Sequence, residues 1–187
     1  DKNRKQRVNK EVSMAKLFTY VDNKRREARP ISIRLEKKYN ADTSRVKDTY
    51  SIINKSVRRN KFVTNDIIGL RFERDKKVEA KHSWKKFNRK KGLYSVNVGV
   101  TMNGEQIGYE DKYKSTPHSN LYRAFHSNFV VKGRKKDSIF GVEAQFRTKK
   151  YGKLNDEMHR DYKLGKKTKK KKQMYKKRSE YLLSQGY

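Results

Sequence analysis

The sequence contains no cysteine, and this absence excludes a disulfide framework and a zinc site built on thiolates. It also has no apolar run close to the length that a membrane-spanning helix needs. The first twelve residues, DKNRKQRVNKEV, lack the apolar centre of a signal peptide. Acidic residues are scarce, because 20 Asp and Glu stand against 51 Lys and Arg. These absences predict a cytoplasmic protein without a membrane partner.

Positive charge is what the sequence has in excess, with a formal net charge of +31. Self-repulsion of this size opposes compaction, so a polyanionic partner is expected, nucleic acid first and nucleotides second. The 187 residues suggest one domain with a modest core, and 12 Tyr and 8 Phe argue against a disordered chain. Composition alone favours a ribosomal or other non-catalytic RNA-binding protein.

Hydrophobic spacing predicts that helices come first along the chain. Residues 10–28 have helical spacing, Pro30 predicts a break, and a second helix is expected over 31–40. A third helix is expected over 47–60. Its apolar face would carry Tyr50, Ile53 and Val57.

Strands are predicted in the middle of the chain. Residues 66–74 read as a buried strand, and two alternating runs flank Asn103-Gly104, which is a strong hairpin signal. Residues 120–131 and 138–148 read as two more strands. A helix from Tyr151 to Leu164 follows, with Leu154, Met158 and Tyr162 on one face, and then a Lys-rich stretch. This order predicts an α+β fold with a mixed, largely antiparallel sheet of about five strands flanked by helices.

The stretch GVEAQFRT, residues 141–148, combines an apolar and a polar face. Val142, Ala144 and Phe146 alternate with Glu143, Gln145 and Arg147. Period two indicates a strand whose apolar side contacts the core. On this pattern alone, the polar row is a solvated sheet surface or the floor of an active site, and the solvated surface is favoured.

Two stretches earlier in the chain could bind phosphates and metal. Lys47, Ser51 and Lys55 are spaced four apart, so on a helix they share one face, and Arg58 lies three residues further on. Such a row suits a triphosphate, although an ordinary basic helix face is an equal alternative. Asp66 begins an apolar strand, where an acid can hold Mg²⁺ or simply cap a turn.

Tyr122 and His126 are four residues apart, so on an extended strand they point to the same side. An exposed Tyr can stack on a nucleic-acid base, while a core Tyr beside a hydrogen-bonded His is the alternative.

In their order and spacing these stretches resemble the synthetase domain of the RelA/SpoT family, the enzymes that make guanosine alarmones. The resemblance covers about residues 40 to 165. Its five motifs stand here as Arg45-x-Lys47-x-x-x-Ser51-x-x-x-Lys55, Asp66-Ile-Ile-Gly69-Leu-Arg71, Pro117-His118-Ser-Asn120-Leu-Tyr122-x-x-x-His126, Val142-Glu143-Ala-Gln145-Phe-Arg147-Thr148 and His159-Arg-Asp-Tyr162-Lys163. It implies a nucleotidyltransferase-like synthetase domain over 1–165, with N-terminal helices over 1–40 and a catalytic core over 41–165. A Lys-rich helix or tail over 166–187 would follow.

The resemblance implies transfer of the β,γ-pyrophosphate of ATP to a ribose 3′-hydroxyl. Arg45 and Arg71 would stack on the adenine. Asp66 and Glu143 would be catalytic and bind Mg²⁺, with Glu143 also the general base. The phosphates of ATP would be held by Lys47, Ser51, Lys55 and Arg58.

On the acceptor side, the resemblance implies that Tyr122 stacks on the base of the acceptor. The remaining acceptor residues would be His118, Asn120, His126, Gln145 and Arg147. Two positions depart from the family pattern: His118 replaces a Lys, and Leu121 replaces a Gly. Gly152 stands where guanosine-specific members commonly carry an Asn.

The acceptor itself is open at this level. The net charge and the altered loop favour the 3′-terminal adenosine of tRNA, as in the toxic small members of the family, and an antitoxin protein would then be a partner. GDP or GTP is the second expectation, which would make a (p)ppGpp synthetase, and ADP or ATP, giving (p)ppApp, is the third. No His is followed by Asp, so the His-Asp pair of the family's hydrolase domain is missing and a small synthetase-only member is expected.

Overall fold

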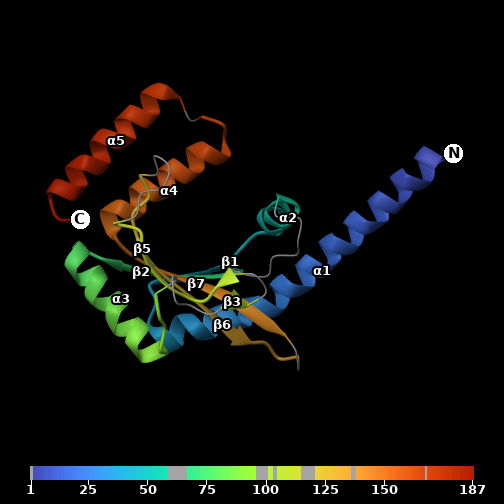
Figure 1. Cartoon of the computed structure of the whole chain (residues 1–187), viewed down its shortest axis with the longest axis horizontal. Coiled ribbons are helices and arrows are strands. Elements are labelled where there is room, and N and C mark those ends of the chain that lie inside the picture. Colours follow the sequence, from blue (N-terminus) through green and yellow to red (C-terminus); the bar gives the residue numbers. More distant parts are fainter. Residues whose placement is uncertain are drawn as a thin grey trace. The chain divides into compact units, whose positions relative to one another are not determined.

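The computed structural model describes residues 2–58, 67–95, 101–102, 105–114, 121–135, 138–166 and 168–187 (Figure 1). Helices occur at both ends of the chain and most strands lie in the middle, as the sequence predicts, but a strand over Thr43–Val46 and a helix over Lys77–Lys91, between strands, were not predicted. The helices are α1 (Lys2–Tyr39), α2 (Thr49–Arg58), α3 (Lys77–Lys91), α4 (Lys149–Lys163) and α5 (Lys169–Ser184). The strands are β1 (Thr43–Val46), β2 (Ile68–Arg74), β3 (Thr101–Met102), β4 (Glu105–Gln106), β5 (Gly108–Asp111), β6 (Phe125–Lys132) and β7 (Ile139–Thr148).

The sheet confirms the predicted α+β class. Five strands pair in the order β1-β2-β7-β6-β5, and β3 pairs with β4 in a separate two-stranded ribbon. The ribbon is antiparallel, with Thr101 opposite Gln106, so the predicted hairpin is confirmed on both sides of its turn. The turn residues, Asn103 and Gly104, lie outside the described residues.

The predicted break at Pro30 is wrong, because α1 is one helix that continues through the proline. Proline removes one backbone hydrogen bond inside a helix. Buried side chains nevertheless continue on both sides of it: Val21, Ala28, Ile31 and Leu35 are at most 4% exposed. Since these residues keep helical spacing across position 30, burial of one continuous apolar face outweighs the lost hydrogen bond.

The predicted apolar face of α2 is only partly right. Ile53 is buried, but Tyr50 and Val57 are 69% and 62% exposed. The buried side is made instead by Ile52, Ile53 and Ser56. The helix begins at Thr49, so Lys47 precedes it and does not share a helical face with Ser51 and Lys55 as predicted.

The chain divides into two compact units, which are described separately. The first comprises residues 1–70 and 130–143, and the second comprises residues 71–129 and 144–187. The core of the first includes apolar side chains of α1, α2 and the strands. The second has an aromatic core, in which Phe72 and Phe146 stack with ring centroids 4.3 Å apart and Trp84 stacks on Phe125 at 4.9 Å.

In the second unit, α5 runs alongside α4 (Figure 1) and is attached to it by buried polar contacts. The Tyr151 hydroxyl donates to the Ser179 carbonyl at 2.8 Å, and both side chains are at most 2% exposed. Asp161 on α4 accepts hydrogen bonds from Tyr175 and Lys171 of α5. Burial, followed by the hydrogen bond to Asp161, raises the pKa of Tyr175 to about 12, so the hydroxyl remains a donor at neutral pH.

Asp161→Asn should loosen α5. The hydrogen bond from Lys171, and then that from Tyr175, lower the pKa of Asp161 below its ordinary value of 3.8. The contact therefore contributes in full above that pH and is lost as the pH falls through the lowered pKa. We expect faster hydrogen exchange of the α5 amides in Asp161→Asn at pH 7, with α3 as the unchanged reference. Equal protection of α5 in both proteins would show that Asp161 does not hold the helix.

Within the described residues, none of the helices combines the length and the apolar composition needed to cross a membrane.

Candidate active site

The side chain of Arg45, which is predicted to stack on adenine, packs against Gly69. Arg45 is on β1, and Gly69 is on β2 in the same unit. A Cβ atom added to Gly69 would lie 3.1 Å from the Arg45 Nε atom and 3.2 Å from its Cγ atom. Gly69 therefore provides the space in which the Arg45 side chain crosses β2. This close approach explains why the second motif has a glycine at this position.

Two of the predicted phosphate-binding residues, Lys47 and Ser51, lie on either side of Asp48, which caps α2. The Lys47 backbone N–H donates to the Ile67 carbonyl at 2.8 Å, which fixes the segment between β1 and α2. Asp48 then caps α2: its carboxylate accepts from the Ser51 N–H at 2.8 Å and from the Ser51 hydroxyl at 2.7 Å. The hydroxyl predicted to bind phosphate is thus oriented by Asp48. Lys55 lies one turn further along α2 and is partly exposed.

Strand β7 separates its two kinds of side chain as the sequence predicts. Val142, Ala144 and Phe146 are at most 1% exposed. Glu143 on the other face is partly exposed, while Gln145 and Arg147 are 9% and 2% exposed. The polar face is therefore not a solvated surface along its whole length, and Glu143 is its accessible part.

Arg147 is buried between two carboxylates of the second unit. Its Nε and Nη2 atoms donate to the Glu73 Oε1 atom at 3.0 and 2.8 Å. Its Nη1 and Nη2 atoms donate to the two Asp156 carboxylate oxygens at 3.2 and 3.0 Å. Arg71, the other predicted adenine-stacking residue, has its Nη2 atom 3.4 Å from Asp156 Oδ1. Asp156 therefore lies between one residue predicted for ATP and one predicted for the acceptor.

The charge of Arg147 is secured by these partners. Burial on its own lowers the pKa of this guanidinium, but hydrogen bonds and charge from Asp156 and Glu73 outweigh burial and raise it. Glu73 and Asp156 were not predicted as site residues. Asp48 had a signal in the sequence, an acid at a helix start, but nothing in the sequence links Glu73 or Asp156 to Arg147.

Gly152 on α4 makes room for this cluster. A Cβ atom at this position would lie 2.8 Å from Arg147 Nε and 2.8 Å from Glu73 Oε1. Both side chains are held by the hydrogen bonds just described, so neither moves away without breaking one. The space at position 152 is thus filled by an ion pair.

Gly152→Ala should therefore destabilise the fold by about 1–3 kcal/mol, the usual cost of overpacking. The measurement is urea unfolding followed by circular dichroism. Gly165→Ala is not a suitable control, because Gly165 has a positive φ of 66°. Lys153→Ala on the exposed side of α4 is the matched variant and should leave stability unchanged. A Gly152→Ala protein as stable as the parent would show that the cluster can move aside.

Tyr122 and His126 lie together, as the sequence predicts. The Tyr122 hydroxyl is 2.8 Å from His126 Nε2, and the rings meet edge to face with centroids 5.4 Å apart. His126 is 3% exposed, and its backbone carbonyl accepts from the Trp84 indole N–H at 3.0 Å. Tyr122 precedes β6 and is partly exposed, so its ring is the accessible member of the pair.

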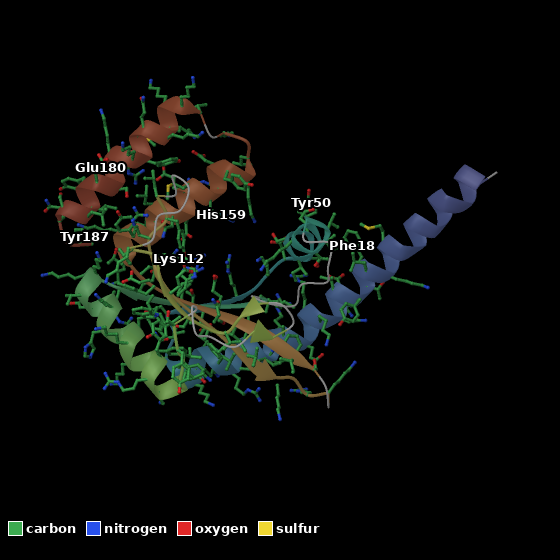
Figure 2. The ribbon with its side chains drawn as sticks, viewed as in Figure 1. Phe18, Tyr50, Lys112, His159, Glu180 and Tyr187 are labelled. Atoms are coloured by element: carbon green, nitrogen blue, oxygen red, sulfur yellow. The ribbon has the colours of Figure 1, made fainter. Side chains whose placement is uncertain are left out.

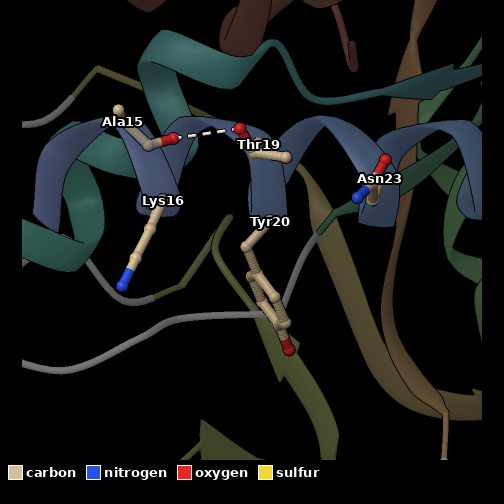
Figure 3. Close-up of a pocket in the computed structure, with 5 residues that line it drawn as sticks. All are labelled: Ala15, Lys16, Thr19, Tyr20 and Asn23. Carbon is tan, nitrogen blue, oxygen red and sulfur yellow. Dashed lines mark hydrogen bonds between the residues drawn. The ribbon is translucent and has the colours of Figure 1, made fainter. Parts of the chain in front are cut away.

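Several predicted site residues cannot be placed. Asp66, His118 and Asn120 and the side chain of Arg58 lie outside the described residues. Of the last motif, His159 (labelled in Figure 2), Tyr162 and Lys163 are exposed on α4. A pocket in the first unit (Figure 3) is lined, among the described residues, by residues of α1, where the Thr19 hydroxyl donates to the Ala15 carbonyl at 3.0 Å. None of the predicted site residues that the structure describes lines that pocket.

The described residues contain no group of three His, Asp or Glu side chains that could hold a metal ion. Mg²⁺ needs few protein carboxylates, because it keeps several waters and binds substrate phosphates. A partly exposed Glu143 carboxylate has the hard oxygen donors that this ion prefers, so the residue fits one ligand position.

The fold and these motifs define an α+β nucleotide-dependent transferase, and comparison with known proteins identifies the family. Residues 44–167 match the family model described as a region found in RelA / SpoT proteins. The chain belongs to this family and is a pyrophosphokinase of the RelA/SpoT type, with ATP as the pyrophosphate donor. None of the curated protein sequences matches it.

Solved structures show the same fold. Small alarmone synthetase 1 from Bacillus subtilis, bound to its product pppGpp, superposes with a TM-score of 0.63 at 20% identity, over 87% of this chain and 89% of that chain. Small alarmone synthetase 2 from Bacillus subtilis has a TM-score of 0.60 at 19% identity, over 91% of each chain. A GTP pyrophosphokinase family protein from Streptococcus pneumoniae has a TM-score of 0.59 at 17% identity, over 96% of this chain and 90% of that chain.

Proposed function

We propose that this enzyme transfers the β,γ-pyrophosphate of ATP to the 3′-hydroxyl of the terminal adenosine of tRNA. The observation that carries the proposal is the net charge of +31 on 187 residues. A free nucleotide needs only a local cationic pocket, whereas a long polyanion can use cations over the whole surface. Because a modified 3′ end cannot be aminoacylated, the enzyme would block translation and act as a toxin, with an antitoxin protein as its partner.

On the donor side, we assign adenine stacking to Arg45 and Arg71. Arg45 crosses β2 over Gly69, and Arg71 is oriented by Asp156, so each guanidinium has a defined support. Phosphate binding is assigned to Lys47, Ser51, Lys55 and Arg58. The positive charge of Lys47, Lys55 and Arg58 would also offset the charge that develops on the transferred group.

Glu143 is assigned as general base and, with Asp66, as ligand to Mg²⁺. The carboxylate takes the proton of the acceptor 3′-hydroxyl, and the oxygen left behind attacks the β-phosphorus of ATP, so that AMP leaves. When bound, Mg²⁺ neutralises charge on the phosphate oxygens. The position of Glu143, partly exposed between buried Val142 and Ala144, supports this role.

On the acceptor side, Tyr122 is assigned to stack on the terminal base, supported by its hydrogen-bonded contact with His126. Gln145 and Arg147 would shape the floor beside Glu143, with Arg147 fixed by Glu73 and Asp156. His118 and Asn120 would complete the acceptor loop.

A guanosine nucleotide is the second candidate acceptor. The observation that favours it is that the Bacillus subtilis synthetase 1 structure contains pppGpp as its product. An adenosine nucleotide as acceptor, which would give (p)ppApp, is the remaining alternative.

One assay separates these acceptors. The protein is incubated with γ-labelled ATP and Mg²⁺, and deacylated tRNA, GDP, GTP or ATP is offered in turn at equal concentration. We expect label on tRNA at a rate at least tenfold above the other acceptors. Preferred labelling of GDP or GTP would replace the proposal with alarmone synthesis, and an absence of label on any acceptor would favour a non-catalytic RNA-binding protein.

A further inference from the structure

Helix α5 presents a row of lysines that no described contact explains. Its exposed cations include Lys169, Lys170, Lys172, Lys176 and Lys177. They span about 12 Å along the helix, at 1.5 Å per residue. Figure 2 shows α5 with its side chains and labels Glu180 near its C-terminal end.

Most of these lysines lack an acidic partner among the residues that the structure describes. Within the described part of the chain, no Asp or Glu lies within salt-bridge distance of Lys169, Lys170, Lys172 or Lys177. Lys176 has only an exposed contact of 3.9 Å with Glu180. Lys171 differs, because it points to Asp161 of α4. The lysines around Lys171 thus repel one another, and no described salt bridge within the protein offsets that repulsion.

The position of this charge along α5 makes it more costly. The helix begins with four consecutive lysines, from Lys169 to Lys172, and has no acid in its first turn. The N-terminal end of a helix carries partial positive charge, so cations there are unfavourable. In α3, by contrast, the cations Arg89, Lys90 and Lys91 occupy the last turn, where they stabilise the helix. Helix stability explains the basic end of α3, but not the basic start of α5.

The row is also held in place. Tyr175 and Ser179 of α5 are 3% and 2% exposed, and they bond to Asp161 and Tyr151 of α4. The lysines therefore project from an ordered helix attached to the second unit. An ordered row of cations loses less entropy on meeting a polyanion than a disordered tail would.

We propose that this face of α5 binds the phosphate backbone of the acceptor tRNA. The inference rests on the proposed function. This face of α5 would bind the tRNA at a distance from its reacting 3′ end. An RNA helix offers a dense row of phosphates over the length of the lysine face, and each contact would release condensed counterions. Binding of this kind depends on salt concentration and does not distinguish base sequences. It therefore suits an enzyme that modifies the end shared by all tRNAs.

The test compares the parent with a variant in which Lys169, Lys170, Lys172 and Lys177 are all changed to Gln. We expect at least a tenfold higher KM for tRNA, with kcat unchanged at saturating tRNA. The slope of log affinity against log salt should fall by about three, since each lost phosphate contact removes about 0.7–0.9. The Kd for ATP should stay the same. Removing cations from the first turn should also leave α5 at least as stable, which hydrogen exchange can verify.

A control matched in charge replaces the exposed α3 residues Lys85, Lys86, Arg89 and Lys90 by Gln. It should change the KM for tRNA by less than threefold. An equal loss in both variants would show that only total charge matters and would overturn the assignment to α5. An unchanged KM and salt slope in the α5 variant would overturn it as well. If the parent itself transfers no label to tRNA, the proposed function has failed, independently of these lysines.

Discussion

Glu143→Gln should abolish pyrophosphate transfer while leaving the fold intact. The substitution keeps the size of the side chain but removes the charge that would bind Mg²⁺ and the group that would take the proton of the 3′-hydroxyl. Loss of a general base alone costs about 10²- to 10⁴-fold, and loss of a metal ligand adds to it. We therefore expect transfer from γ-labelled ATP to fall at least about a thousandfold, with an unchanged urea unfolding curve.

The matched control is Glu110→Gln. Glu110 lies on β5, is 35% exposed and contacts Lys112 at 3.6 Å, and it belongs to none of the family motifs. It should retain transfer within about twofold, because an exposed ion pair of this kind contributes little to stability. A folded Glu143→Gln protein with full activity would remove Glu143 from the mechanism.

Arg147→Met should give the largest loss of stability. The Arg147 side chain is 3% exposed and donates four hydrogen bonds to Glu73 and Asp156. Without the guanidinium, Glu73 and Asp156 lose the buried cation that they share, while Asp156 keeps its 3.4 Å contact with Arg71. Since they are 31% and 49% exposed, water would recover part of the loss, and we expect unfolding to be easier by about 3 kcal/mol.

Urea unfolding of three variants would test this prediction. Arg147→Lys should recover little of the stability, because one ammonium cannot reproduce the planar fork that reaches both carboxylates. Asp156→Asn should cost less than Arg147→Met, since Asp156 is the more exposed partner and Glu73 would remain. A loss below about 1 kcal/mol in Arg147→Met would show that the cluster is not a structural support of the site.

The regular parts of the fold could be predicted from sequence because local chemistry determines them. Alternation of apolar and polar residues predicts β7, and Asn103-Gly104 between alternating runs predicts the β3–β4 hairpin. The continuation of α1 through Pro30 could not be predicted in this way. It depends on burial of side chains on both sides of the proline, which is a tertiary effect and outweighs the local preference.

The same division applies to the site. The family motifs contain Glu143, Arg45 and Arg71, so roles for these residues can be proposed from residue order, and those roles stay predictions. The contacts that support Arg71 could not be predicted in this way. Glu73 lies 74 residues before Arg147, and Asp156, nine residues after Arg147, contacts it only in the folded second unit. Gly152 shows the consequence: the resemblance implied only that an Asn is absent there, whereas in the fold the space at position 152 is filled by Arg147 and Glu73.

The most direct test of the central claim uses two tRNAs that differ in one oxygen atom. One ends in adenosine and the other in 3′-deoxyadenosine, and each is incubated with the enzyme, γ-labelled ATP and Mg²⁺. We expect labelling of the first tRNA and none of the second, since the second lacks the hydroxyl that attacks the β-phosphorus. Equal labelling of both tRNAs, or labelling of neither while GDP or GTP is labelled, would contradict it.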